Sequence, residues 1–114
     1  MEQLKDILKQ KVKQINEDEV RLKAIKNWIK GAYGGPKIVS FKTVDKAYHL
    51  IFTEEKGVEL REGDYPGFNL SYQGSEDNVL KILNGERSAY NVWQEKELHV
   101  WGGLSEALAF EKLL

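Results

Sequence analysis

The spacing of apolar residues changes at Gly34-Gly35-Pro36, and this change constrains the fold more than any other feature of the sequence. Before the break, apolar residues recur every three or four positions, which is the spacing of an amphipathic helix. After it they recur at every second position, which is the spacing of a strand with one buried face. The chain therefore predicts an α+β fold in which helices cover one face of a sheet.

Two helices are expected before the break and a run of strands after it. The first helix spans residues 2–15, and Asn16 with Glu19 has the spacing of a capping box at the start of the second. Gly31 suits the C-terminal cap of that second helix. The expected strands are residues 37–43, 47–53, 58–61, 68–73 and 98–102. Short turns separate the first three strands, which predicts an antiparallel meander.

The C-terminal part alternates between helix and strand signals. Ser75 is expected to cap a helix that ends at Gly85, and a short helix is expected over residues 86–94. Ser105 is expected to cap the last helix, which is apolar on nearly every side. Such a helix must be enclosed or must face something apolar.

Length and charge exclude several classes of protein. The 114 residues suit a single domain over 1–114, with a helical segment 1–30 and a sheet with covering helices over 36–114. The formal net charge of −1 opposes nucleic acid as a partner. The chain contains no cysteine and no apolar run long enough to span a membrane, so we expect a cytoplasmic protein.

The sequence offers little support for catalysis. The two histidines, His49 and His99, lie on different expected strands and are interpreted as surface residues. No histidine or carboxylate spacing predicts a metal site, and no Gly-x-Ser-x-Gly motif is present. Helix capping and solvation account for the paired acids Glu54-Glu55 and Glu76-Asp77. The prediction is a protein that is not an enzyme and has no cofactor and no metal.

Several segments in order resemble the sterol carrier protein type-2 (sterol/lipid transfer) family. These segments are Tyr48–Leu50 with Gly57–Gly63, the capped helix and glycine of Gly74–Gly85, the closing strand Leu98–Gly102, and the terminal helix within Gly103–Leu114. The resemblance covers roughly residues 25–114, and the order and spacing of the segments carry it. Two departures are Lys96, where the family often has glycine, and the absence of the family's usual proline from 87–93.

The resemblance implies a mostly antiparallel five-stranded sheet with a crossover, helices on one face, and an enclosed cavity for an apolar ligand. It implies binding and transfer of lipids such as fatty acids, acyl thioesters or sterol-like molecules. Physical chemistry permits this without a motif, because each buried methylene contributes about 0.8 kcal/mol to binding. In the family the C-terminal segment helps to close the ligand tunnel, so the last helix is the expected lid.

The candidate ligand-binding residues lie on the helices after residue 75. They are Leu80, Leu83, Tyr90, Trp93, Leu104, Leu108 and Phe110. Each of them could equally be an ordinary core residue. Strand alternation places Trp101, like Ile51, on the sheet face opposite the helices, so these two are candidates for a homodimer contact or a transient membrane contact.

Two alternatives to a lipid carrier remain open at this point. One is a non-catalytic interaction or dimerisation module of the same fold, whose cavity is filled by side chains. The other is an accessory domain of a lipid-metabolising enzyme, or a partner to one.

Overall fold

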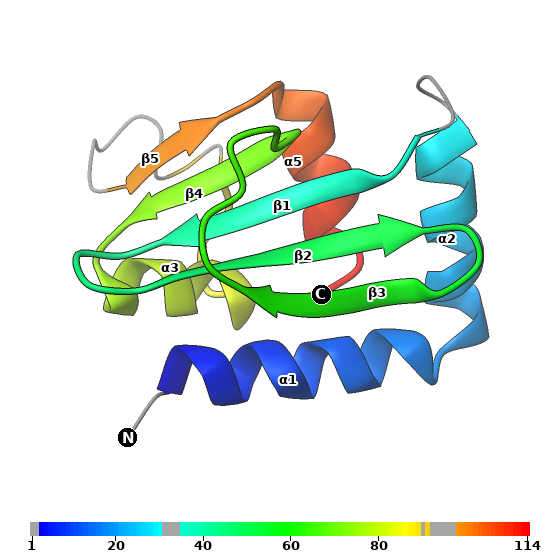
Figure 1. Cartoon of the computed structure of the whole chain (residues 1–114), viewed down its shortest axis with the longest axis horizontal. Helices are drawn as coiled ribbons and strands as arrows, with labels where there is room; N and C mark the ends of the chain where they lie inside the picture. The colour runs from blue at the N-terminus through cyan, green and yellow to red at the C-terminus, as the bar shows by residue number, and fades with distance from the viewer. Residues whose placement is uncertain (1–2, 31–34, 90, 92–97) are drawn as a thin grey trace.

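The structure is a computed structural model, and it describes residues 3–30, 35–89, 91 and 98–114. Helices precede, interrupt and follow the strands, in keeping with the α+β prediction (Figure 1). In chain order the elements are α1 (Gln3–Asn16), α2 (Glu19–Lys30), β1 (Lys37–Lys42), β2 (Ala47–Thr53), β3 (Gly57–Glu62), β4 (Leu70–Gly74), α3 (Glu76–Leu83), β5 (Leu98–Trp101) and α5 (Leu104–Glu111).

The five strands form one sheet in the order β3-β2-β1-β4-β5. β1, β2 and β3 form the expected antiparallel meander, and β4 pairs antiparallel with β5. β4 runs parallel to β1, so the sheet is mixed, and the prediction of a mostly antiparallel sheet is corrected. The reason is the connection after β3, which crosses the sheet and returns the chain beside β1 in the same direction. Hydrophobic period carries no information on strand direction.

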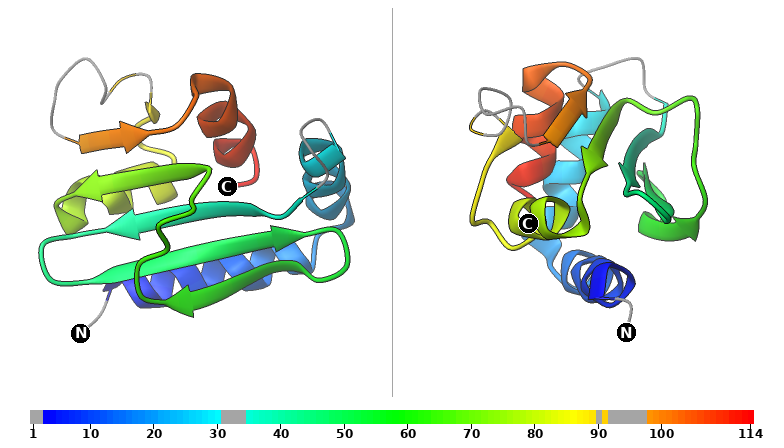
Figure 2. Two further views of the ribbon diagram at one scale, coloured as in Figure 1. Left: turned by 45° about the horizontal axis from the view of Figure 1, so that its top comes forward. Right: turned by 90° about the vertical axis from the view of Figure 1, so that its left-hand side faces the viewer.

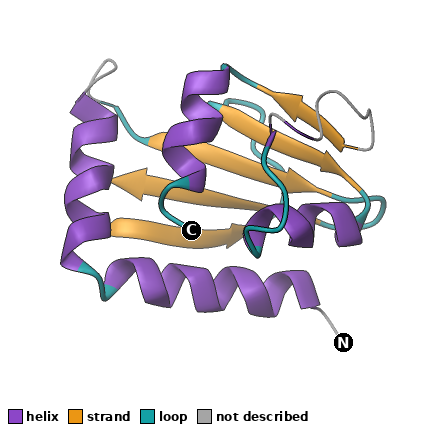
Figure 3. Cartoon of the chain, turned by 180° about the vertical axis from the view of Figure 1, so that it is seen from behind, coloured by secondary structure: helices purple, strands orange, loops and turns teal. Residues whose placement is uncertain are grey.

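The helices lie on one face of the sheet (Figures 2 and 3). The strand residues that face them are apolar and fully buried, and they include Val39, Phe41, Leu50, Phe52 and Tyr72. Two stripes on α1 and α2 add Leu4, Leu8, Ile15, Ile25 and Ile29 to this core. Burial of these stripes is the main source of the stability of short helices.

The connection 63–69 covers part of the opposite face, and Figure 1 shows it passing in front of β2 and β1. Ser40 lies fully buried beneath it and donates a hydrogen bond to Asp64 Oδ1 (3.4 Å). His49 Nδ1 lies 2.9 Å from the Gly63 carbonyl oxygen, and His49 is only 7% exposed. The interpretation of His49 as a surface residue is therefore wrong, because the crossover adds a cover that strand alternation cannot predict. His99 is exposed, as expected.

One of the helix caps predicted from the sequence is present in the structure, and two differ. Ser75 Oγ accepts a hydrogen bond from the Asn78 N–H at the start of α3, as expected. At the start of α2, Asp18 accepts from the N–H groups that follow it, at 2.9 Å and 3.4 Å. Asn16 instead pairs with both backbone groups of Val58 on β3, at 2.8 Å and 2.9 Å. The expected capping box does not form, and the Asn16 side chain joins the α1–α2 corner to the sheet instead.

The last helix begins two residues earlier than a Ser105 cap requires. Leu104 is its first residue, and Gly103 stands at the N-cap position without a side-chain hydrogen bond. Gly31, the expected C-cap of α2, and most of the expected helix 86–94 lie outside the described residues.

Replacement of Gly102 by alanine is expected to lower the free energy of unfolding by about 2–3 kcal/mol. Gly102 has φ = +121°, and a Cβ atom there would lie 2.5 Å from the Asn69 carbonyl oxygen. Gly63→Ala is the matched control, since φ is +100° there but no atom lies within 4 Å of the added Cβ. The control should cost about 1 kcal/mol. Urea denaturation measures both losses, and equal losses would refute the close approach of β5 to residue 69.

Candidate functional site

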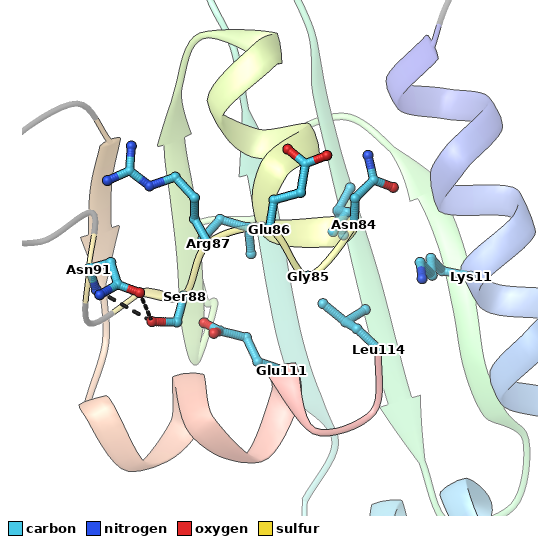
Figure 4. A pocket seen from close by; sticks show the side chains of 11 residues that line it. Lys11, Asn84, Gly85, Glu86, Arg87, Ser88, Asn91, Glu111 and Leu114 are labelled. Atoms are coloured by element: carbon cyan, nitrogen blue, oxygen red, sulfur yellow. Dashed lines mark hydrogen bonds between the residues drawn. The ribbon is translucent and has the colours of Figure 1, made fainter.

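A pocket of about 320 Å³ lies on the helical side of the molecule, between α1, the end of α3 and the segment after α5. Figure 4 shows Lys11 on the side formed by α1, across from Ser88 and Glu111. Its volume is at the lower end of the range for small-molecule sites. The residues that line it are Lys11, Ile82, Leu83, Asn84, Gly85, Glu86, Arg87, Ser88, Asn91, Glu111 and Leu114.

The pocket combines apolar and polar lining. Ile82 and Leu83 reach it from α3 and are almost fully buried, and half-buried Leu114 lies beside them. Two cationic side chains, Lys11 and Arg87, are half-buried at its walls. Such a lining suits an amphipathic small molecule better than a purely apolar one.

Glu111 connects the pocket wall to the core. Its Oε2 accepts a hydrogen bond of 2.7 Å from the Tyr72 hydroxyl, and the Ala89 N–H donates to the same oxygen at 3.1 Å. Burial, together with the neighbouring Glu111 carboxylate, raises the pKa of the Tyr72 hydroxyl above its ordinary value. Tyr72 therefore stays protonated and remains a donor. These bonds hold the end of α5 to β4 and to the segment after α3.

A second pocket of about 310 Å³ adjoins the first between α1 and α3. The two pockets share Asn84, and the second is also lined by Gln3, Asp6, Ile7 and Leu80. Ile7 and Leu80 are half-buried apolar residues at the α1–α3 contact. The surface between these two helices is therefore indented on both sides of Asn84.

The space between the sheet and α5 is filled by aromatic side chains. The ring of Phe110 on α5 lies 5.9–6.0 Å from the rings of Phe41, Phe52 and Tyr72, measured between centroids. Trp28 of α2 contacts Phe52 edge-on at 5.3 Å. Such ring pairs add to the stability of a core more free energy than the burial of their apolar surface alone provides. Among the described residues, this cluster packs α5 and α2 against the sheet.

The structure distributes the predicted ligand-binding residues over three environments. Leu83 lines the first pocket and Leu80 the second. Leu104 and Leu108 are exposed on α5, at 37% and 46%, and Phe110 is fully buried in the aromatic cluster. Tyr90 and Trp93 lie outside the described residues.

The two candidates for a dimer or membrane contact also differ from each other. Trp101 is 54% exposed, whereas Ile51 is half-buried and so less accessible. Trp101 pairs in register with Ser71, and its neighbour Val100 pairs with Tyr72, which faces the helices. Trp101 therefore lies on the face opposite the helices.

Sequence reasoning did not select the polar residues of the first pocket. Lys11 could have been found, because Leu4, Leu8 and Ile15 mark the buried stripe of α1 and Lys11 falls on that stripe. Glu111 and Arg87 carry no such local signal, since only the tertiary fold brings them to one place.

The described part of the chain contains no cluster of histidine, cysteine or carboxylate side chains able to hold a metal ion. Within the same residues, no helix has the length and hydrophobicity needed to span a membrane.

No family model and no curated protein matches the sequence, but solved structures match the fold. The chain is similar to a UbiJ-SCP2 ubiquinone synthesis protein (TM-score 0.64, 13% identity, covering 87% of this chain and 81% of that one). It is also similar to the apo form of sterol carrier protein 2 from Yarrowia lipolytica (TM-score 0.58, 18% identity, 91% and 84%).

A third similar structure belongs to a much longer protein, the inverting sec-alkylsulfatase Pisa1 from Pseudomonas sp.. Its TM-score is 0.60 at 14% identity, and the match covers 75% of this chain but only 14% of the sulfatase. The fold of this chain is therefore that of a sterol carrier protein 2-like domain, and the resemblance inferred from the sequence is confirmed at the level of fold.

Proposed function

We propose that this chain binds one lipid-like molecule at the pocket between α1, α3 and the segment after α5, and that it performs no chemistry on it. The observation that carries the proposal is the pocket itself, which joins an apolar wall of Ile82 and Leu83 to polar groups at its rim. The sterol carrier protein 2-like fold supports it, because the names of similar structures refer to sterol carriers.

The depth of the pocket limits the length of the chain that it can hold. Leu114 lines the pocket, and the adjoining core is closed by buried Leu83 and Phe110. A long acyl chain therefore fits only if the segment after α5 shifts outward. Exchange of the ligand would then be passive, and its affinity would come from burial of apolar surface.

Removal of the whole last helix does not test this movement, because α5 and the segment after it contribute Ala107, Phe110 and Leu113 to the core. A substitution that fills the pocket is a cleaner test. Leu114→Trp adds volume to the pocket wall, and Leu108→Trp adds the same volume on the exposed side of α5.

The first experiment is mass spectrometry of organic extracts from the purified protein, with native mass alongside. We expect about one co-purified lipid or acyl species per chain in the unmodified protein and in Leu108→Trp. Leu114→Trp should reduce that occupancy severalfold. An unmodified protein that carries no such species and fails to take up a fluorescent fatty acid would contradict the proposal.

An interaction module of the same fold is the second candidate, and the filled aromatic core is the observation that favours it. The exposed Trp101 is the place where a partner copy would contact the sheet. Light scattering separates the two functions. The interaction module is supported if the unmodified protein carries no lipid and is a dimer, and if the Trp101→Ser variant is a monomer.

A further inference from the structure

Lys11 occupies a position of α1 at which the helical spacing predicts an apolar residue. Leu4, Leu8 and Ile15 are buried at intervals that continue through residue 11. Lys9 and Lys13, by contrast, lie on the exposed side of the same helix. Lys11 is half-buried against the first pocket instead of being fully solvated.

No carboxylate of the described residues lies within ion-pair distance of Lys11. Other lysines near the helices have such partners: Lys5 pairs with Glu62 at 2.5 Å, and buried Lys37 pairs with Glu106 at 2.9 Å. A cation that loses part of its hydration gains from an anionic partner. The position of Lys11 therefore favours a negative group inside the pocket.

The half-buried acid and the hydroxyl group of the pocket, Glu111 and Ser88, are engaged with other groups. Both oxygens of Glu111 accept hydrogen bonds, from Tyr72 and from the Ala89 N–H. Ser88 donates to the Asn91 side chain at 2.8 Å. Glu86 is exposed to solvent. Of the half-buried charged groups that line the pocket, the Lys11 ammonium group is therefore the one without a partner among the described residues.

From this arrangement we infer that the pocket selects an amphiphile with an anionic head group, a carboxylate or a phosphate, whose head lies at Lys11 and whose tail contacts Leu83 and Leu114. This inference rests on the proposed function and narrows its ligand class. A charge-assisted hydrogen bond at a partly desolvated lysine is strong enough to give about a tenfold preference over a neutral head.

The test compares ligands of one chain length at pH 8, below their micellar concentrations: dodecanoate, dodecyl phosphate and 1-dodecanol. The proteins are the unmodified chain, Lys11→Gln, Lys11→Arg and the control Lys9→Gln. We expect the unmodified chain, Lys9→Gln and Lys11→Arg to bind at least one anionic amphiphile about tenfold more tightly than the alcohol. Lys11→Gln should lose this preference and keep its affinity for the alcohol.

Three results would overturn the inference in different ways. An equal preference in Lys11→Gln would remove Lys11 from head-group selection. Loss of alcohol binding in Lys11→Gln would show that Lys11 maintains the shape of the pocket instead. Inorganic phosphate that competes as well as the amphiphiles would indicate a site for free anions. If the unmodified chain binds none of the three amphiphiles, the proposed function itself fails.

Discussion

Replacement of Phe110 by alanine is expected to lower the free energy of unfolding by about 3–5 kcal/mol. Phe110 is fully buried and contacts the rings of Phe41, Phe52 and Tyr72, so the substitution leaves a cavity in the centre of the core. Urea denaturation monitored by circular dichroism measures the loss. Leu108→Ala is the control on the same helix, and it should cost less than about 1 kcal/mol because Leu108 is 46% exposed.

The same variant tests how the core is related to ligand binding. Phe110 belongs to the same core cluster as Leu83, which forms part of the wall of the first pocket. If the chain is a lipid carrier, added dodecanoate should restore part of the lost stability, since a ligand that binds only the folded state stabilises it. If dodecanoate does not stabilise Phe110→Ala and the unmodified protein carries no lipid, the interaction module is favoured.

Replacement of Glu106 by alanine is expected to cost about 3 kcal/mol of unfolding free energy. Glu106 accepts hydrogen bonds from Lys37 Nζ, at 2.9 Å and 3.1 Å, and from Trp28 Nε1, at 3.0 Å. The Lys37 side chain is only 4% exposed, so loss of the carboxylate leaves a buried ammonium group without its partner. The value lies at the low end for buried pairs because the Glu106 side chain is 26% exposed.

A double variant separates the ion pair from the packing around it. Lys37→Met with Glu106→Leu removes both charges and keeps apolar volume, so its stability should lie within about 1 kcal/mol of the unmodified protein. Thermal and urea denaturation of Lys37→Met, of Glu106→Leu and of the double variant complete the double-mutant cycle. A double variant that loses as much as Glu106→Ala would show that the hydrogen bond to Trp28, and not the buried charge, holds α5 in place.

The pair also explains how α5 acquires its position. Lys37 lies on the helix-facing side of β1, Trp28 belongs to α2, and Glu106 lies in the first turn of α5, where a negative charge also favours the helix dipole. Three elements distant in the sequence therefore meet at one carboxylate. Together with the bonds of Glu111 to Tyr72 and Ala89, this contact fixes both ends of α5 over the sheet.

Local spacing was sufficient for the kind and order of most elements. The change of period at Gly34-Gly35-Pro36 separates the two N-terminal helices from the meander, and the cap at Ser75 agrees with the start of α3. These features depend on neighbours within a few residues, so they can be read from the chain. Asn16 shows the limit of such reading, because its side chain bonds to Val58 across the fold instead of to the helix beside it.

The candidate site divides in the same way. The sequence by itself determined that the helices after residue 75 carry surplus apolar surface, but it did not single out Lys11, which the helical spacing sets in line with Leu4, Leu8 and Ile15. Only the tertiary structure decided that β4 runs parallel to β1, that Phe110 fills the space beneath α5, and that Lys11 meets Leu83 and Leu114 at one pocket. The physical reason is distance along the chain: helix and strand patterns arise from interactions a few residues apart, whereas the pocket needs α1, α3 and the segment after α5 packed on one sheet.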